Sequence, residues 1–147
     1  NPVILMAGGF GKRLHPLTKD KPKPLLEIGG SPILEIILKQ MIRVGFHNFY
    51  ISTGTPQNKI VNILKEKKLF SFFKKIYGSP RSKVEHIKEI KKKNINIVFI
   101  GDSLEDFKAS VETNIDFILK LNSENILFRK KINVRTIQSF KYLNRYI

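Results

Sequence analysis

Two groups of residues in this sequence have types and spacings suited to chemistry on phosphates: one could hold the phosphate and the other a metal ion. The first group is a glycine-rich turn with two cations, formed by Gly8, Gly9, Gly11, Arg13 and Lys23. Glycines let backbone N–H groups approach a polyphosphate without obstruction by side chains. Arginine then offers a planar fork to phosphate oxygens, and lysine offers a point charge. No Gly-Lys-Ser/Thr step follows, which excludes a Walker A loop. We expect a phosphate-binding loop here.

The second group is a pair of carboxylates, Asp102 and Asp106. Asp102 follows a predicted buried strand, and Asp106 lies one helical turn further on. Two carboxylates at this spacing can coordinate one hard cation. The alternative is that an aspartate here caps the start of a helix. The pair predicts a candidate metal site.

Short apolar runs alternate with amphipathic segments along the whole chain. We expect strands at 3–6, 49–52, 75–77, 95–100 and 116–119, and helices at 32–44, 56–68, 82–93 and 104–113, with a short strand and a helix in the tail. Gly45 is the predicted C-cap of the first helix. Strands that alternate with helices are typical of a three-layer α/β fold with a parallel sheet.

The opening segment resembles the sugar-1-phosphate nucleotidyltransferase family. The resemblance rests on the run Ala-Gly-Gly-x-Gly-x-Arg-Leu-x-Pro-Leu-Thr from Ala7 and on the Pro-Lys-Pro around Lys23, and it extends to about residue 52. It implies that Ala7, Gly8, Gly9 and Gly11 bind the nucleotide and its phosphates. It also implies that Arg13 stabilises the leaving pyrophosphate, that Lys23 binds phosphate near the reacting centre, and that Mg²⁺ neutralises charge.

From about residue 53 the chain resembles the haloacid dehalogenase (HAD) phosphatases. The matching motifs are Thr-Gly-Thr-Pro from Thr53, Tyr-Gly-Ser-Pro followed by Lys83, and Gly-Asp-Ser-Leu-Glu-Asp ending at Asp106. This resemblance implies that Thr53 and Gly54 hold the phosphate and that Lys83 steadies it. It further implies that Asp102 and Asp106 help to hold Mg²⁺.

Each resemblance lacks residues that its family needs. The metal-binding aspartate and sugar pocket of the transferases lie beyond the matched part. The Asp-x-Asp-Gly of the phosphatases is missing, because Ala7 follows the first strand and no aspartate precedes Asp20. We expect one composite α/β domain over 1–147, with a nucleotidyltransferase-like segment at 1–52 and a HAD-like segment at 53–147. The expected strand order is HAD-like, 5-4-1-2-3, with Val3–Met6 as strand 1 and ligands bound at the switch point between strands 1 and 4.

The expected function is binding of Mg²⁺ and of a nucleoside triphosphate or sugar phosphate, with little or no catalysis. Without the aspartate, the covalent phosphatase route has no nucleophile. Two alternatives stay open. One is an active nucleotidyltransferase, which joins a nucleoside triphosphate and a sugar-1-phosphate into a nucleotide sugar and pyrophosphate. The other is an active HAD-type sugar-phosphate phosphatase. Both ancestries indicate nucleotide-sugar biosynthesis.

Composition narrows the partners. The chain has 147 residues and a formal net charge of +15, but its lysines are scattered and form no basic stripe with interleaved aromatics. We therefore expect phosphorylated small molecules rather than nucleic acid. No apolar run approaches the roughly 20 residues that span a bilayer. Cysteine is absent, which excludes disulfides and thiol chemistry. These features predict a cytoplasmic protein without membrane contact.

Overall fold

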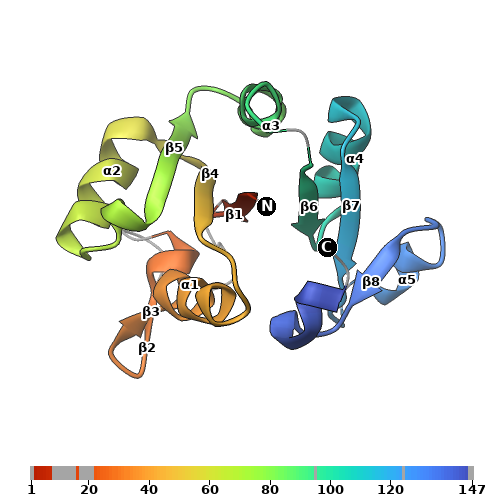
Figure 1. Cartoon of the computed structure of the whole chain (residues 1–147), viewed down its shortest axis with the longest axis horizontal. Helices are drawn as coiled ribbons and strands as arrows, with labels where there is room; N and C mark the ends of the chain where they lie inside the picture. The colour runs from red at the N-terminus through yellow and green to blue at the C-terminus, as the bar shows by residue number, and fades with distance from the viewer. Residues whose placement is uncertain (1, 8–15, 17–21, 95, 124, 146–147) are drawn as a thin grey trace.

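Parallel strands joined by helical crossovers make up the protein (Figure 1). The computed structural model describes residues 2–7, 16, 22–94, 96–123 and 125–145. The α/β class with parallel sheets agrees with the prediction from the sequence.

The first ladder holds β1 (Pro2–Met6), β4 (Asn48–Pro56) and β5 (Phe73–Ser79) in the order β1-β4-β5. Both pairings are parallel, with Ile4 opposite Tyr50 and Ile51 opposite Ile76. The apolar runs predicted at 3–6, 49–52 and 75–77 thus lie within real strands, and β4 and β5 extend beyond the predicted bounds.

The second ladder holds β6 (Val98–Gly101), β7 (Asp116–Lys120) and β8 (Arg135–Ile137), again parallel and in the order β6-β7-β8. β6 begins later than the predicted strand at 95–100. Ile97 is buried without being part of the ladder, so an apolar side chain here indicates burial and not strand pairing.

The two ladders meet where β1 lies beside β6 (Figure 1). The predicted order 5-4-1-2-3 corresponds to β7-β6-β1-β4-β5. The first ladder supplies β1-β4-β5 of this order, and the second supplies β7-β6. Backbone pairing between β1 and β6 is not found among the residues that the structure describes, so the continuous sheet stays a prediction at this join.

Helical segments connect the strands. They are η2 (Lys23–Leu25), α1 (Ile33–Arg43), α2 (Gln57–Glu66), η3 (Phe70–Phe72), α3 (Lys83–Lys91), α4 (Leu104–Thr113), α5 (Ile126–Arg129) and η4 (Phe140–Arg145). A small hairpin, β2 (Glu27–Ile28) and β3 (Ser31–Pro32), precedes α1. α1 ends as predicted, because Gly45 adopts a φ of +94° and Phe46 N–H donates back to the Met41 carbonyl at 3.1 Å.

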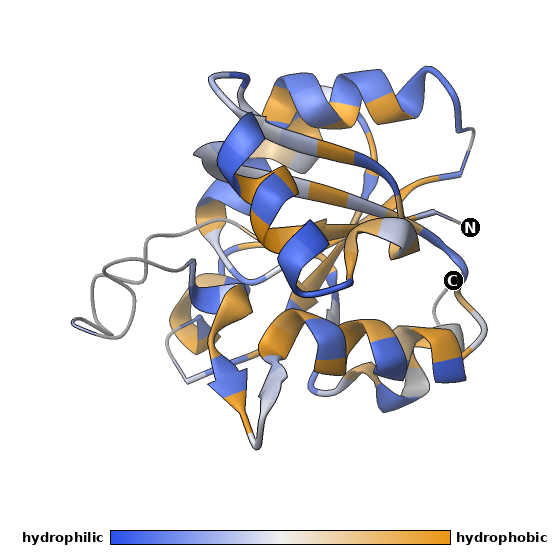
Figure 2. Ribbon diagram, turned by 90° about the vertical axis from the view of Figure 1, so that its left-hand side faces the viewer, coloured by the Kyte–Doolittle hydropathy of each residue, from blue (hydrophilic) through white to orange (hydrophobic). Residues whose placement is uncertain are grey.

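Side chains on each strand alternate between two hydrophobic cores. Val3 of β1 and Val98 of β6 pack with the core that includes α1 and α2, whereas Ile4 and Phe99 belong to the core that includes α3 and α4. In Figure 2 the central strands are mostly hydrophobic, and the helices alternate hydrophobic and hydrophilic stripes. Because both cores draw on both ladders, the helices and strands form the three layers expected from the sequence.

Among the described residues, no helix has the length and apolar character required to cross a membrane.

Candidate functional site

The candidate site lies at the carboxyl ends of β1, β4 and β6. Ala7 follows β1, Thr53 lies in the last part of β4, and Asp102 follows β6. Helix α3 joins these strand ends to α4. Its His86 contacts Ser52 of β4, and one turn earlier its Lys83 contacts Asp106 of α4. Asp106 therefore contacts both Lys83 and Asp102, and Thr53 is linked to this group through its neighbour Ser52 and His86.

Thr53 links β4 to the end of β1. Its hydroxyl donates to the Ala7 carbonyl at 2.7 Å, while the Ala7 N–H donates to the Ser52 carbonyl at 2.9 Å. The Thr53 Oγ1 also accepts the Thr55 N–H at 3.1 Å. Ala7 and Thr53 are both buried. The backbone groups of Ala7 are thus already committed to β4, and the glycine-rich segment begins at the residue that follows.

Lys83 and Asp106 form an ion pair that joins two helix starts. Lys83 is the first residue of α3, and its Nζ donates to Asp106 Oδ1. The Lys83 side chain is 33% exposed and that of Asp106 is 8% exposed. A lysine has three N–H donors. Lys83 can therefore keep Asp106 as a partner and still offer donors to an anion.

Asp106 is also part of the cap of α4. Its Oδ2 accepts the backbone N–H groups of Asp102 and Ser103 at 3.2 and 3.3 Å, and its own N–H donates to Ser103 Oγ at 3.1 Å. This is a capping box, the arrangement that the sequence offered as the alternative to a metal site. Both carboxylate oxygens of Asp106 are engaged within the protein.

Asp102, in contrast, presents its carboxylate at the surface. The Asn122 amide approaches Asp102 Oδ2 at 3.5 Å, and the Asn125 amide donates to the Asp102 carbonyl at 3.0 Å. No cluster of three histidine or acidic side chains suited to a metal occurs among the described residues. Mg²⁺ usually takes one or two carboxylates and completes its shell with water and substrate phosphates. The exposed Asp102 suits that arrangement, whereas a cage built only from protein groups does not fit.

Of the remaining predicted site residues, the structure describes two and leaves four outside the described residues. Gly54 is exposed, and a Cβ placed on it would meet nothing within 4 Å. Lys23 is exposed on η2, which packs on α1, and no hydrogen bond or ion pair within the described residues links it to Lys83 or Asp102. Gly8, Gly9, Gly11 and Arg13 lie outside the described residues.

Sequence reasoning missed several residues that build the site. A Cβ on Gly101 would lie 2.7 Å from Asp106 Oδ2, so only glycine lets that carboxylate fold over the end of β6. The sequence did carry a signal for the role of Asp106 in the cap of α4: the Ser-x-x-Asp spacing from Ser103 is typical of a capping box. Buried Asn125 donates to the carbonyls of Asp102 and Lys120, a role that no motif indicates.

His86 is the other missed residue. It is 1% exposed, its Nδ1 lies 2.8 Å from Ser52 Oγ, and its ring stacks on Tyr77 with 5.3 Å between centroids. Burial lowers the pKa of His86 below its ordinary value, which favours the neutral ring. His86 therefore fixes α3 on β4 as an uncharged group and so positions Lys83.

Comparison with known sequences decides the family. The sequence model of the nucleotidyl transferase family matches residues 2–125. The chain belongs to the nucleotidyl transferase family. It is 27% identical over 117 residues to a 2-aminoethylphosphonate cytidylyltransferase of Lancefieldella rimae, an alignment that covers 80% of this chain and 43% of that protein. It is 33% identical over 101 residues to a glucose-1-phosphate cytidylyltransferase of Salmonella typhimurium, with 69% and 39% covered.

The chain thus spans less than half the length of these two relatives. The family match nevertheless runs well past residue 52, where the resemblance read from the opening motif stopped.

Comparison with solved structures shows a different likeness. The core domain of a protein described as a phosphoglycolate phosphatase, from Streptococcus pneumoniae, superposes with a TM-score of 0.58 at 18% identity, covering 99% of this chain and 95% of that one. A haloacid dehalogenase-like hydrolase from the same organism gives a TM-score of 0.54 at 20% identity, covering 76% and 58%. At these identities the likeness concerns the fold. A transferase-family sequence is therefore combined with a HAD-like arrangement of strands and helices.

Proposed function

We propose that this protein binds Mg²⁺ together with the phosphate groups of a nucleoside triphosphate or sugar phosphate, with little or no turnover. The observation that carries the proposal is the connected group of Thr53, Lys83, Asp102 and Asp106 at the strand ends, combined with Ala7 in the place where a HAD phosphatase needs its nucleophilic aspartate. The group offers a cation and an exposed carboxylate but no nucleophile.

The proposal gives each side chain a separate task. Lys83 donates to phosphate oxygens while Asp106 keeps its ammonium in position. The exposed Asp102 carboxylate shares Mg²⁺ with the phosphate, and the Asn122 and Asn125 amides position Asp102. Gly54 leaves open space for a phosphate to approach the backbone. Mg²⁺ supplies positive charge against the phosphate oxygens.

The proposal includes a single composite domain over 1–147, in which the two ladders act as one sheet in the order β7-β6-β1-β4-β5. The contact between β1 and β6 and the two cores shared by both ladders support it. In this order Ala7 and Asp102 follow adjacent strands. The glycine-rich segment, with Arg13 and Lys23, would then start beside the Asp102 carboxylate, at the switch point of the sheet.

Family membership favours a second function, an active nucleotidyltransferase. In that case the glycine-rich segment would bind the triphosphate, Arg13 would stabilise the leaving pyrophosphate, Lys23 would hold phosphate and Asp102 would take the place of the missing metal ligand. The named substrates of the relatives, 2-aminoethylphosphonate and glucose-1-phosphate with cytidine triphosphate (CTP), are the first compounds to test.

Three assays separate these functions. Calorimetry measures binding of CTP with Mg²⁺, a pyrophosphate assay measures transfer to each acceptor, and a phosphate assay measures hydrolysis of sugar phosphates. We expect binding that weakens at least tenfold in Lys83→Met and Asp102→Asn, and no turnover. Pyrophosphate release that disappears in Arg13→Ala would establish the transferase. Phosphate release lost in Asp102→Asn would establish a phosphatase.

A further inference from the structure

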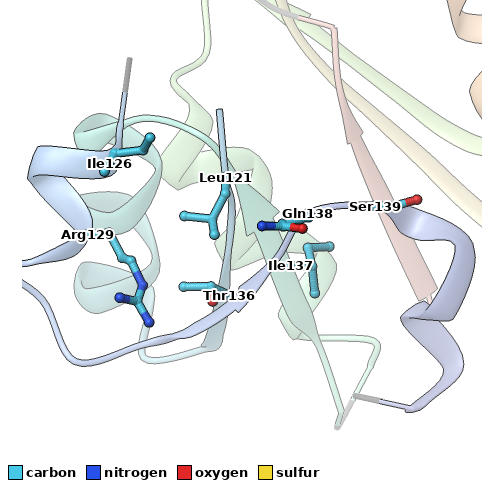
Figure 3. A pocket seen from close by; sticks show the side chains of 7 residues that line it. All are labelled: Leu121, Ile126, Arg129, Thr136, Ile137, Gln138 and Ser139. Atoms are coloured by element: carbon cyan, nitrogen blue, oxygen red, sulfur yellow. The ribbon is translucent and has the colours of Figure 1, made fainter. Parts of the chain in front are cut away.

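A pocket of about 680 Å³ lies at the carboxyl ends of β7 and β8, beside α5 (Figure 3). Leu121, Ile126 and Ile137 give it apolar walls, and Arg129, Thr136 and Gln138 contribute polar groups. Its volume falls in the usual range for small-molecule sites, roughly 300–1,000 Å³. None of the positions predicted from the sequence is among its lining residues.

Positive charge dominates this pocket. Arg129 is the one charged residue in the described lining, which contains no carboxylate. Its exposed guanidinium forms no ion pair within the part of the chain that the structure describes. A guanidinium without an acidic partner, set beside a hydroxyl and an amide, suits a planar, bidentate contact with phosphate.

The walls of the pocket are fixed by hydrogen bonds. The Leu121 N–H donates to the Ile137 carbonyl at 2.8 Å, which continues the β7–β8 ladder into the pocket. Asn122 and Asn125 exchange two side chain to backbone bonds of 3.0 Å, and the Asn125 amide also donates to the Lys120 carbonyl at 2.8 Å. These bonds hold the start of α5 at the end of β7. A ligand would thus meet a surface already in place, which lowers the entropic cost of binding.

We propose that this pocket binds a small organic phosphate. The phosphate lies on the Arg129 guanidinium, with Thr136 and Gln138 as further donors, and the organic body covers Leu121 and Ile126. The site is distinct from the Lys83 and Asp102 group and does not depend on the function proposed above. One loop separates the two sites, since the Asn125 that anchors α5 also bonds to the Asp102 carbonyl.

The test is a calorimetric titration of the full chain with cytidine monophosphate, inorganic phosphate and uncharged cytidine, without Mg²⁺. Arg129→Gln should weaken nucleotide binding at least tenfold. Lys130→Gln removes the same charge from an exposed neighbour outside the pocket lining, and it should change nucleotide binding less than twofold. Ile126→Ser should weaken the nucleotide but not inorganic phosphate. Amide signals of residues 121 and 136 should shift in NMR spectra on addition of the nucleotide.

The NMR shifts of residues 121 and 136 should persist in Asp102→Asn and Lys83→Met if the two sites are separate, so failure of the first proposal leaves this one standing. Equal losses in Arg129→Gln and Lys130→Gln would mean only diffuse electrostatic attraction and would overturn the proposal. It also fails if inorganic phosphate binds as tightly as the nucleotide, or if neither binds. Loss of the NMR shifts in Asp102→Asn would place the ligand at the other site and refute the assignment to Arg129.

Discussion

Asp106 is the residue at which a structural role and a metal-binding role can be told apart. The structure assigns both its oxygens to the protein, to Lys83 on one side and to the N–H groups of Asp102 and Ser103 on the other. Asp106→Ala leaves the Ser103 cap in place but removes the reciprocal half of the capping box, so the N–H groups of Asp102 and Ser103 lose their acceptor at a cost of about 1 kcal/mol each. The ion pair adds at most about 1 kcal/mol, because Lys83 is one-third exposed.

We therefore expect Asp106→Ala to lower the free energy of unfolding by about 2–3 kcal/mol, measured by urea denaturation. For a chain of this size that corresponds to a fall in Tm of roughly 5–10 °C. Asp102→Asn is the matched control. Asp102 is exposed and accepts a single 3.5 Å bond from Asn122, so its loss should change stability by less than about 0.5 kcal/mol.

Ligand-induced stabilisation completes this test. Mg²⁺ with CTP at a hundred times its dissociation constant should stabilise the native chain by about 2.7 kcal/mol. Asp102→Asn should lose most of this gain, whereas Asp106→Ala should start from a lower stability and keep part of it. The reasoning is refuted if Asp106→Ala is as stable as the native chain yet loses the gain, because Asp106 would then be a metal ligand and not part of the fold.

Three further variants test other features of the site. Gly101→Ala should lower the free energy of unfolding by about 2 kcal/mol, because its Cβ would press on the Asp106 carboxylate; an unchanged urea midpoint would contradict the contact. Gly54→Ala meets open space, so it should leave Tm unchanged but weaken CTP binding if phosphate approaches that backbone; equal binding would place the phosphate elsewhere. Burial lowers the pKa of His86, so the stability it contributes is complete above pH 6.5 and declines as the pH falls below that value. His86→Gln should flatten this decline between pH 7 and 5, exposed His47→Gln should not, and identical slopes in both would refute the assignment.

The sequence predicted the strands and helices well because their signals are local. The run Val3–Met6 and the glycine at position 45 carry their conformational preference within a few residues. Strand bounds were harder to predict. Ile97 is as apolar as a strand residue, yet it is buried without pairing, because burial depends on the helices that pack above it. Pairing between strands depends on distant residues, so the join of β1 to β6 had no local signal.

For the candidate site, the sequence proposed the residues, and the structure adds the contacts of those that it describes. Thr53, Lys83 and Asp102 were expected to meet at one edge; Asp106 contacts Lys83 and Asp102, whereas Thr53 is linked to α3 only through its neighbour Ser52, which contacts His86. The residue types left two roles open for the aspartates, since a carboxylate at a helix start can cap the helix or bind a metal. Only the tertiary arrangement shows that both oxygens of Asp106 are taken while Asp102 faces the surface. The Arg129 pocket was missed because its lining comes from two separate segments without a motif.

The combination of a transferase-family sequence with a HAD-like fold has a physical basis in Ala7. A HAD phosphatase needs a carboxylate at the end of its first strand, and here a buried alanine is bound to β4 through both of its backbone groups. A carboxylate at this buried position would lose hydration and gain no partner from the Thr53 hydroxyl, which already donates to the backbone carbonyl. The same bonds fix the point from which the glycine-rich segment leaves the strand. An alanine held in this way offers no nucleophile at the end of β1, and this supports the proposal that the protein binds phosphate without hydrolysing it.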